Sequence, residues 1–186
     1  MSRFYLIETN IKDLKVVERK PIADARGFLS RIYCAESFSA FGLNKPIAQI
    51  NHTLTRNKGT VRGLHFQYAP HSETKFVSCI KGEVYDVAVD LRKGSPTFLN
   101  WHAEILSADN HKSLLIPEGF AHGFQTLTDN CELIYLHTEA YVPSAEGAFN
   151  VLDSCFNIQW PLPITELSDR DRRHAMIDEN FQGLVV

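Results

Sequence analysis

Two histidine-bearing segments contain the residues best suited to chemistry in this sequence. Residues 59–67 contain His65, and residues 117–124 contain His122. Each histidine stands in an apolar, strand-like run that is punctuated by glycine. A single histidine in such a run is usually a core residue, but two in one small domain, with Arg62 and Lys75 close by, indicate a polar site. A neutral imidazole, whose reference pKa is about 6.5, is a suitable proton acceptor near pH 7.

Several common active-site signatures are absent from the sequence. It contains no GxGxxG, GxxxxGK[ST] or GxSxG run, which argues against a dinucleotide-binding fold, a P-loop and a nucleophile elbow. We expect no metal, because a catalytic zinc or iron site needs about three protein ligands. Only His65 and His122 fit, unless His71 or Glu73 joins them, and Lys75 would repel a metal ion.

Short strands separated by Gly, Pro, Asn and Asp must position these residues. In residues 83–91, one face carries Tyr85, Val87, Val89 and Leu91, and the other carries Asp86 and Asp90. The predicted strands are residues 14–19, 28–33, 47–55, 60–67, 74–80, 83–91, 97–106, 113–116, 121–128 and 131–138. Many closely spaced strands are typical of a sandwich, a barrel or a jelly roll, so the sequence predicts an all-β fold.

Helix is predicted only at residues 36–41 and 168–174, the latter with Ser168 as N-cap and acidic residues in the first turn. The 186 residues fit one domain, 1–186, and a hydrophobic content of 44% with 12 Phe supports a packed core. No repeat or linker divides the chain. The last dozen residues are expected either to pack on the body or to remain loose.

The charge balance limits the classes of partner. The net charge is −3 and the isoelectric point is about 6.2, so we expect neither nucleic acid nor a membrane as partner. An anionic ligand therefore needs a local cluster of Arg and Lys. There is no apolar run long enough for a signal peptide or a membrane span. The cysteines, Cys34, Cys79, Cys131 and Cys155, are widely spaced, as expected for reduced thiols of a cytoplasmic protein.

The two histidine segments resemble the two motifs of cupins, and residues 117–122 match the PxGxxH pattern of the second motif. Cupins usually bind metal through an HxH pair, which is broken here because Phe66 and Gln67 follow His65. A closer resemblance, from about residue 13 to 174, is to the dTDP-4-dehydrorhamnose 3,5-epimerase family. The matching positions are residues 24–28, 49–51, 62–67, 75, 82–90, 95–98, 117–124, 135, 141, 146 and 167–171.

This resemblance implies a cupin double-stranded β-helix, or jelly roll, with short peripheral helices. It implies a cofactor-free isomerase of rhamnose-type deoxysugar biosynthesis, in which Asp171 orients the base His65. Tyr135 would be the acid on the opposite side of the sugar ring, and Lys75 would stabilise the enolate oxygen. The small-molecule sugar nucleotide would be bound by Arg26, Phe28, Gln49, Asn51, Arg62, Lys75, His122, Tyr141, Glu146 and Arg170. A homodimer is also implied, with Arg26 and Phe28 entering the neighbouring subunit's site.

The chemistry of a 4-keto sugar agrees with these roles. The C3 and C5 protons are both α to the carbonyl, so their removal leaves charge on the ketone oxygen, where a fixed cation stabilises it. Inversion requires a second group that returns the proton to the other face. On a regular strand Arg62 and His65 would face apart, so either Gly63 marks a bulge or Arg62 reaches round an edge.

Two departures from the family pattern leave alternatives open. Arg31 and Leu136 stand where the family commonly has Glu and Lys. A Tyr–Leu pair resembles relatives that epimerise only C3, so a C3-only epimerase is the alternative to epimerisation at both C3 and C5. More distant alternatives are a metal-dependent cupin dioxygenase or isomerase and a non-catalytic sugar-nucleotide binder.

Overall fold

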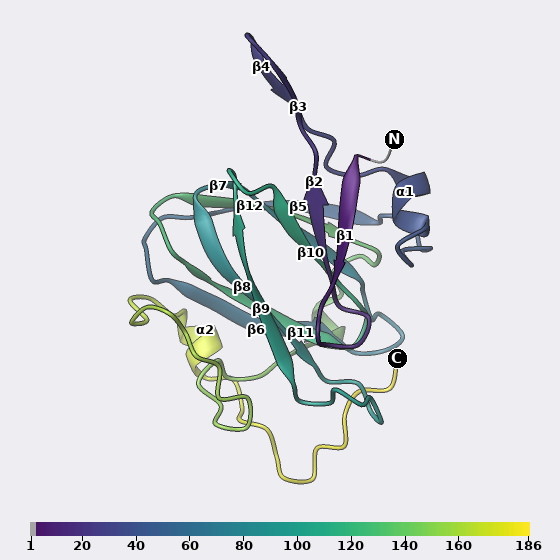
Figure 1. Cartoon of the computed structure of the whole chain (residues 1–186). Coiled ribbons are helices and arrows are strands. Elements are labelled where there is room, and N and C mark those ends of the chain that lie inside the picture. The colour runs from purple at the N-terminus through teal and green to yellow at the C-terminus, as the bar shows by residue number, and fades with distance from the viewer. Residues whose placement is uncertain (1–2) are drawn as a thin grey trace.

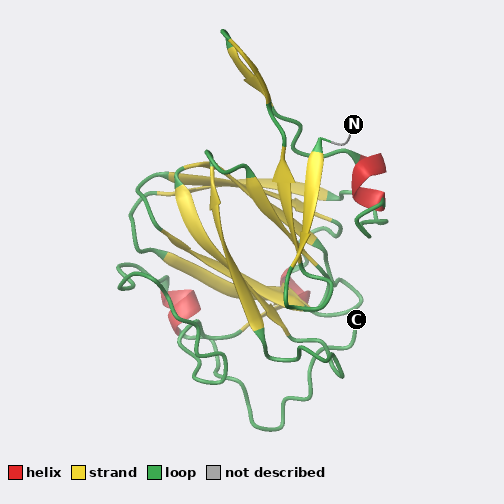
Figure 2. Cartoon of the chain, viewed as in Figure 1, coloured by secondary structure: helices red, strands yellow, loops and turns green. Residues whose placement is uncertain are grey.

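The chain forms two antiparallel β-sheets that face each other in a jelly roll (Figure 1; Figure 2). The computed structural model describes residues 3–186. The six-stranded sheet has the order β1 (Phe4–Glu8), β2 (Lys15–Arg19), β10 (Lys112–Ile116), β7 (Lys75–Lys81), β12 (Cys131–His137) and β5 (Gln49–Thr55). The five-stranded sheet has the order β13 (Glu146–Ala148), β6 (Val61–Gln67), β11 (Phe120–Thr126), β8 (Glu83–Asp90) and β9 (Trp101–Ser107).

The remaining elements lie outside these sheets. A hairpin of β3 (Ile22–Asp24) and β4 (Gly27–Leu29) extends away from the body (Figure 1). The helices are short: α1 (Ala35–Ser39), the 3-10 helix η1 (Pro143–Ala145) and α2 (Asp169–Arg172). As predicted, Ser168 caps α2, and its hydroxyl oxygen accepts a hydrogen bond of 3.0 Å from the Asp171 N–H. None of the described helices is long and apolar enough to span a membrane.

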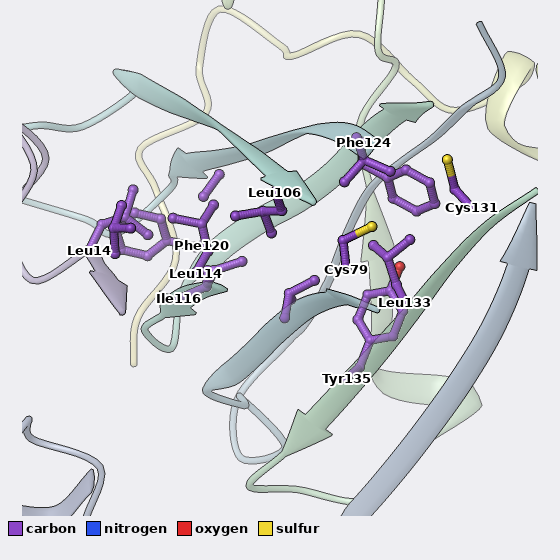
Figure 3. Packing of buried hydrophobic residues seen from close by; sticks show 14 of the residues in the cluster. Leu14, Cys79, Leu106, Leu114, Ile116, Phe120, Phe124, Cys131, Leu133 and Tyr135 are labelled. Atoms are coloured by element: carbon purple, nitrogen blue, oxygen red, sulfur yellow. The ribbon is translucent and has the colours of Figure 1, made fainter. Parts of the chain in front are cut away.

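Three apolar clusters bury both faces of the sheets. The first fills the space between them and includes Leu114, Phe120, Leu133 and Tyr135 (Figure 3). The other two cover the outer faces. Residues of the C-terminal segment, Phe149 to Leu184, pack on the five-stranded sheet, and α1 packs on the six-stranded sheet. The alternation predicted for residues 83–91 is therefore present, but both of its faces are buried.

Most predicted strands are confirmed, with small shifts at their ends. The strand predicted at residues 28–33 is confirmed only at its start, as β4, which ends at Leu29. It pairs with β3 across a turn in which the Arg26 N–H bonds the Asp24 carboxylate at 2.8 Å. The strand predicted to begin at residue 97 begins at Trp101, since Ser95 and Thr97 instead donate to the Asp90 carboxylate. Strands β1, β3 and β13 were not predicted.

The C-terminal tail packs on the body rather than remaining loose. Leu184 is buried, and its N–H donates to the Leu91 carbonyl. All four cysteines are free thiols, but only Cys79 and Cys131 are buried in the core.

Candidate active site

A cleft of about 790 Å³ opens between the two sheets. Strands β5, β7 and β12 line one side, strands β6, β11 and β13 line the other, and residues 165–172 close it. The predicted site residues that line the cleft are Asn51, Arg62, His65, Lys75, His122, Tyr135, Tyr141, Glu146, Arg170 and Asp171. Residues spread over more than a hundred positions of sequence therefore meet at one place.

His65 and Asp171 form a hydrogen-bonded pair on the side of the five-stranded sheet. Nε2 of His65 lies 2.8 Å from Oδ1 of Asp171, and the Ser168 cap holds Asp171 at the start of α2. Burial alone would raise the pKa of Asp171, but hydrogen bonds from His65 and Ser168 outweigh it and hold the pKa below its ordinary value. An ionised carboxylate only accepts, so Nε2 of His65 carries the proton and Nδ1 is free to take one.

Tyr135 stands opposite this pair, on β12 of the six-stranded sheet. Its ring stacks on His137 with a centroid distance of 6.0 Å, and meets the His122 ring edge-on at 5.9 Å. Burial and the nearby Asp86 raise the pKa of Tyr135 above its ordinary value. The phenol therefore keeps its proton at neutral pH, which is the state that a proton donor requires.

His122 belongs to a second, deeper histidine–carboxylate pair. Its Nε2 lies 2.8 Å from Oδ1 of Asp86, whose side chain is completely buried. Burial raises the pKa of Asp86, although the positive charge of a protonated His122 would lower it. His122 lines the cleft and its ring contacts Tyr135, whereas Asp86 lies outside the cleft lining.

A chain of hydrogen bonds leads from Gln49 to Lys75. The Gln49 amide donates to Oδ1 of Asn51 at 3.0 Å, and the Asn51 amide donates to Nε2 of His137 at 3.3 Å. His137 must then carry its proton on Nδ1, which lies 2.8 Å from Oε2 of Glu73. The other oxygen of Glu73 is 3.2 Å from Nζ of Lys75. Glu73 is thus held by Lys75 and His137, and it does not join His65 and His122 as a metal ligand.

Lys75 is a buried cation beside the base. Its ammonium group also donates to the backbone carbonyl of His65 at 3.1 Å, and its side chain is only 8% exposed. The positive charge of Lys75 and the hydrogen bond from His137 together outweigh the burial of Glu73 and hold the pKa of Glu73 below its ordinary value. The cleft therefore contains a fixed positive charge whose position is set by two partners.

A bulge in β6 brings Arg62 and His65 into the same cleft. His122 on β11 pairs with His65, and Phe124 pairs with Arg62, so β6 has one residue more than β11 between the two pairs. This confirms the first of the two explanations for their spacing. Gly63 makes the bulge possible, because it has φ +134° and lies so close to β11 that a Cβ would meet the Cα of Gly123 at 2.6 Å.

Three further predicted residues meet at the mouth of the cleft. The Tyr141 hydroxyl donates to Oε2 of Glu146 at 2.8 Å, and Arg170 forms an ion pair with Oε1 of the same carboxylate. Burial opposes ionisation of Glu146, but the bonds from Arg170 and Tyr141 hold its pKa below its ordinary value. This cluster joins β13 to the segment that carries Asp171.

Three predicted site residues do not line the cleft of their own chain. Gln49 touches the site through Asn51, and its side-chain oxygen accepts from the Tyr141 N–H at 3.0 Å. Arg26 and Phe28 lie on the extended hairpin, where Arg26 pairs with Asp24 and the Phe28 side chain is exposed. Within one subunit, neither reaches the reacting groups.

Glu73, His137 and Asp86 are residues around the site to which the motifs assigned no role in the reaction or in sugar binding. Glu73 and His137 stand two positions from Lys75 and Tyr135, the spacing of residues that share a face of a strand. Asp86 lies on the predicted polar face of its strand. A spacing of two positions from a predicted site residue would therefore have identified Glu73 and His137, but not Asp86.

Known proteins resemble this chain closely. The family model described as dTDP-4-dehydrorhamnose 3,5-epimerase matches residues 8–179. The enzyme of that name from Salmonella typhimurium is 42% identical over 176 residues, covering 94% of this chain and 96% of its own. The crystal structure of a dTDP-6-deoxy-D-glucose-3,5-epimerase from Legionella pneumophila, in complex with dTDP-4-keto-L-rhamnose, has 36% identity and a TM-score of 0.91, covering 98% of this chain and 99% of that one.

A relative of narrower activity is also similar. The structure of a 3'-monoepimerase from Streptomyces bikiniensis, in complex with dTDP-quinovose, has 34% identity and a TM-score of 0.83, covering 90% of this chain and 85% of its own. These likenesses over almost the whole chain confirm the predicted cupin jelly roll.

Proposed function

Because the chain belongs to the dTDP-4-dehydrorhamnose 3,5-epimerase family, we propose that it inverts C3 and C5 of a dTDP-4-keto-6-deoxy-hexose in deoxysugar biosynthesis. One observation supports this assignment above the others. His65, bonded to Asp171 of α2, projects from one sheet and Tyr135 from the other, into a single cleft. A proton acceptor and a proton donor on opposite walls are what inversion at a carbon atom requires.

In this mechanism His65 removes the proton α to the ketone. Asp171 holds the proton on Nε2, so Nδ1 is the nitrogen that attacks the C–H bond. As the imidazole becomes imidazolium, the negative charge of Asp171 stabilises it. Asp171 is therefore a positioning and charge-stabilising group for the base.

Lys75 stabilises the charge that develops on the ketone oxygen. Its ammonium is buried and fixed by Glu73 and the His65 carbonyl, so it needs little reorganisation as the enolate forms. Tyr135 then protonates the ring carbon from the face opposite His65. The same pair acts at C3 and at C5, because both carbons are adjacent to the same ketone.

Binding of the sugar nucleotide falls to the polar residues around this centre. Arg62 and Arg170 are the cations suited to the diphosphate, since guanidinium groups bind phosphate oxygens in pairs. Hydrogen bonds to the sugar and to the nucleobase come from Asn51, His122, Tyr141 and Glu146. Leu136 is buried in the outer cluster on the six-stranded sheet, so this departure from the family pattern does not line the sugar site.

NMR of a dTDP-4-keto-6-deoxy-hexose in deuterated water tests the proposal. Wild type should incorporate deuterium at C3 and C5 and form the inverted product. His65→Asn should lower the exchange rate by a factor of about 10²–10⁴, as expected for loss of a general base, while the variant still binds dTDP. Exchange at C3 alone would indicate the C3-only alternative. Near-normal exchange in His65→Asn would remove this residue from the mechanism, and dTDP binding without exchange in wild type would indicate a binding protein.

We infer further that the enzyme is a homodimer whose hairpins exchange. The hairpin extends from the body with Phe28 65% and Leu29 70% exposed, which is unusual for an isolated chain. An apolar groove beside β5 and β12 is also open, lined by Ile32, Tyr33, Ile47, Ala48, Gln49, Ile50, Ile134 and Leu136. A second copy would cover both and would place Arg26 in the partner's cleft.

Four free thiols suit the reducing cytoplasm, where we place the enzyme.

Mixing two inactive variants tests the exchanged hairpin. Arg26→Ala and His65→Asn each disable one contribution to the site. If Arg26 acts in the partner's cleft, a mixed dimer contains one site with both residues intact, and mixing after mild dissociation should restore activity. Absence of restoration, in a mixture shown by native mass spectrometry to contain the mixed dimer, would show that Arg26 does not act across the interface.

A further inference from the structure

A third side chain meets the base pair of the cleft. His174 lies one turn after Asp171, and its Nε2 is 3.3 Å from Oδ1 of Asp171. Nε2 of His65 approaches the same oxygen at 2.8 Å, and the two imidazole rings meet edge-on at 5.7 Å and 82°. Two imidazole nitrogens thus converge on one carboxylate oxygen, and the three ligand atoms lie within 4.8 Å of one another.

His174 takes no part in the proposed epimerisation. Its Nε2 is buried and has no well-aligned hydrogen-bond partner, which is uncommon for a buried polar atom. Its backbone is nevertheless held firmly, because the Asn150 amide donates to the carbonyls of His174 at 3.2 Å and Arg172 at 3.1 Å. A fixed imidazole with an unused nitrogen, pointing at an ionised carboxylate, has the form of an empty ligand position.

The other histidine–carboxylate pairs of the described residues lack this arrangement. One imidazole meets one carboxylate in each of them: His52 with Glu132, His102 with Glu104, His122 with Asp86 and His137 with Glu73. Among residues 3–186, the His65, Asp171 and His174 set is the only group of three or more His, Cys, Asp or Glu side chains with converging ligand atoms. Two imidazoles and one carboxylate are ligands that Zn²⁺ takes readily, with water in the fourth position, whereas Mg²⁺ prefers oxygen ligands alone.

We propose that His65, Asp171 and His174 form a binding site for Zn²⁺ or a similar transition-metal ion, and that the ion inhibits the enzyme. The metal takes the place of the proton between His65 and Asp171. Nε2 of His65 and Nε2 of His174, which both point at the Asp171 carboxylate, each release a proton to water and use the lone pair to bind the metal. A neutral imidazole must then carry its proton on Nδ1, which takes that proton from water, so no net protons are gained or lost.

This tautomer change switches off the base. With Nδ1 protonated, His65 has no lone pair to accept the sugar proton. The metal is therefore an inhibitor bound on the catalytic pair, in contrast to the metal cofactor that the dioxygenase alternative would need. The inhibition rests on the proposed function of His65, whereas the binding itself does not.

Calorimetric titration of ZnCl₂ into untagged, metal-free protein tests the binding. Wild type should bind one Zn²⁺ per chain at this site, and MgCl₂ at the same concentration should give no binding. His174→Ala should weaken Zn²⁺ binding by about tenfold or more, since loss of even an outer-sphere partner commonly has that effect. His174→Gln, which keeps more of the side-chain volume, should show the same loss, and thermal melting verifies that each variant is folded.

His52→Ala is the matched control, because His52 pairs with Glu132 at 2.9 Å on the exposed side of β5, away from the cleft. It should leave Zn²⁺ binding unchanged. Absence of a stoichiometric site in wild type, or equal weakening in the His174 and His52 variants, would overturn the proposal.

Deuterium exchange at C3 and C5 measures the inhibition, with each variant compared with its own metal-free rate. Zn²⁺ should inhibit wild type reversibly, with full recovery after chelation, and inhibition of His174→Ala should require about tenfold more Zn²⁺. Loss of activity on chelation, or activation by Zn²⁺, would contradict an inhibitory site. If no 4-keto sugar is a substrate, the proposed function fails, but the calorimetric result still decides whether the metal site exists.

Discussion

At the scale of single residues, the site depends on which atom of each group holds a proton. Asp171 stays ionised and fixes the tautomer of His65, and burial keeps the proton on Tyr135. The base and the acid therefore begin the reaction in the states that they need. The energetic reason is the same for both, because a buried group takes the charge state that its neighbours stabilise.

Replacing Tyr135 with Phe should separate proton exchange from inversion. His65 still removes the α proton and Lys75 still holds the enolate, but no donor remains on the opposite face. Deuterium should enter at C3 or C5 with retention, while inverted product falls far more than exchange does. Both are measured by NMR in one reaction. Tyr85→Phe is the control, since Tyr85 packs against Trp160 on the outer face and should leave both rates intact. Equal loss or equal retention of exchange and inversion in Tyr135→Phe would rule out a two-sided mechanism.

At the scale of elements, the bulge in β6 decides which residues reach the substrate. The extra residue between Arg62 and His65 places side chains of opposite parity in one cleft. Close contact between Gly63 and Gly123 leaves no room for a Cβ at this point. The strand pairing and the site geometry thus rest on the same pair of glycines.

Replacing Gly63 with Ala should therefore damage the site more than the fold. The new Cβ forces β6 away from β11 or returns it to regular pairing, and φ +134° is unfavourable for alanine. We expect a loss of about 1–3 kcal/mol in unfolding free energy, as for other overpacked positions, and a large fall in exchange rate. Gly94→Ala is the control, because the φ of Gly94 is also positive, at +73°, but no atom lies within 4 Å of its Cβ. A Gly63 variant as active as the Gly94 variant would contradict this account of the bulge.

At the scale of the whole molecule, two sheets close around one interior and are covered on both outer faces. A turn outside the cleft, which follows β8, is held by a buried charge. Asp90, whose side chain is fully buried, accepts 2.9 Å and 2.8 Å bonds from Arg92, and it also binds Ser95 and Thr97. Burial opposes ionisation of Asp90, but these donors hold its pKa below the ordinary value.

This network predicts the behaviour of the protein in acid. Because the folded-state pKa of Asp90 is lowered, its contribution is complete above the unfolded pKa of about 3.9 and is lost as pH falls through the lower folded value. Asp90→Asn should reduce the unfolding free energy at pH 7 by about 3–5 kcal/mol, as when one partner of a buried ion pair is removed. The difference in unfolding free energy between Asp90→Asn and wild type should become smaller below a pH of about 4. Urea unfolding between pH 7 and 3 measures it. Asp109→Asn, on an exposed turn, should match wild type throughout. If that difference in unfolding free energy does not change with pH, the charge of Asp90 is not what stabilises the fold.

The sequence by itself determined the local features of this protein. Alternation and turn residues predicted most of the strands, Ser168 marked the start of α2, and the family motifs indicated ten residues that line the cleft. These features depend on neighbours within a few positions, where side-chain period and capping leave a pattern in the sequence.

Only the tertiary structure decided how distant segments meet. It placed Glu73 and His137 beside Lys75, resolved the bulge at Gly63, and extended the hairpin away from the body. It also brought His174 to the oxygen that His65 already binds. Such contacts join residues of separate strands and loops, so they follow from sheet register and backbone strain. These contacts cannot be predicted from the type of one residue or from its immediate neighbours in the sequence.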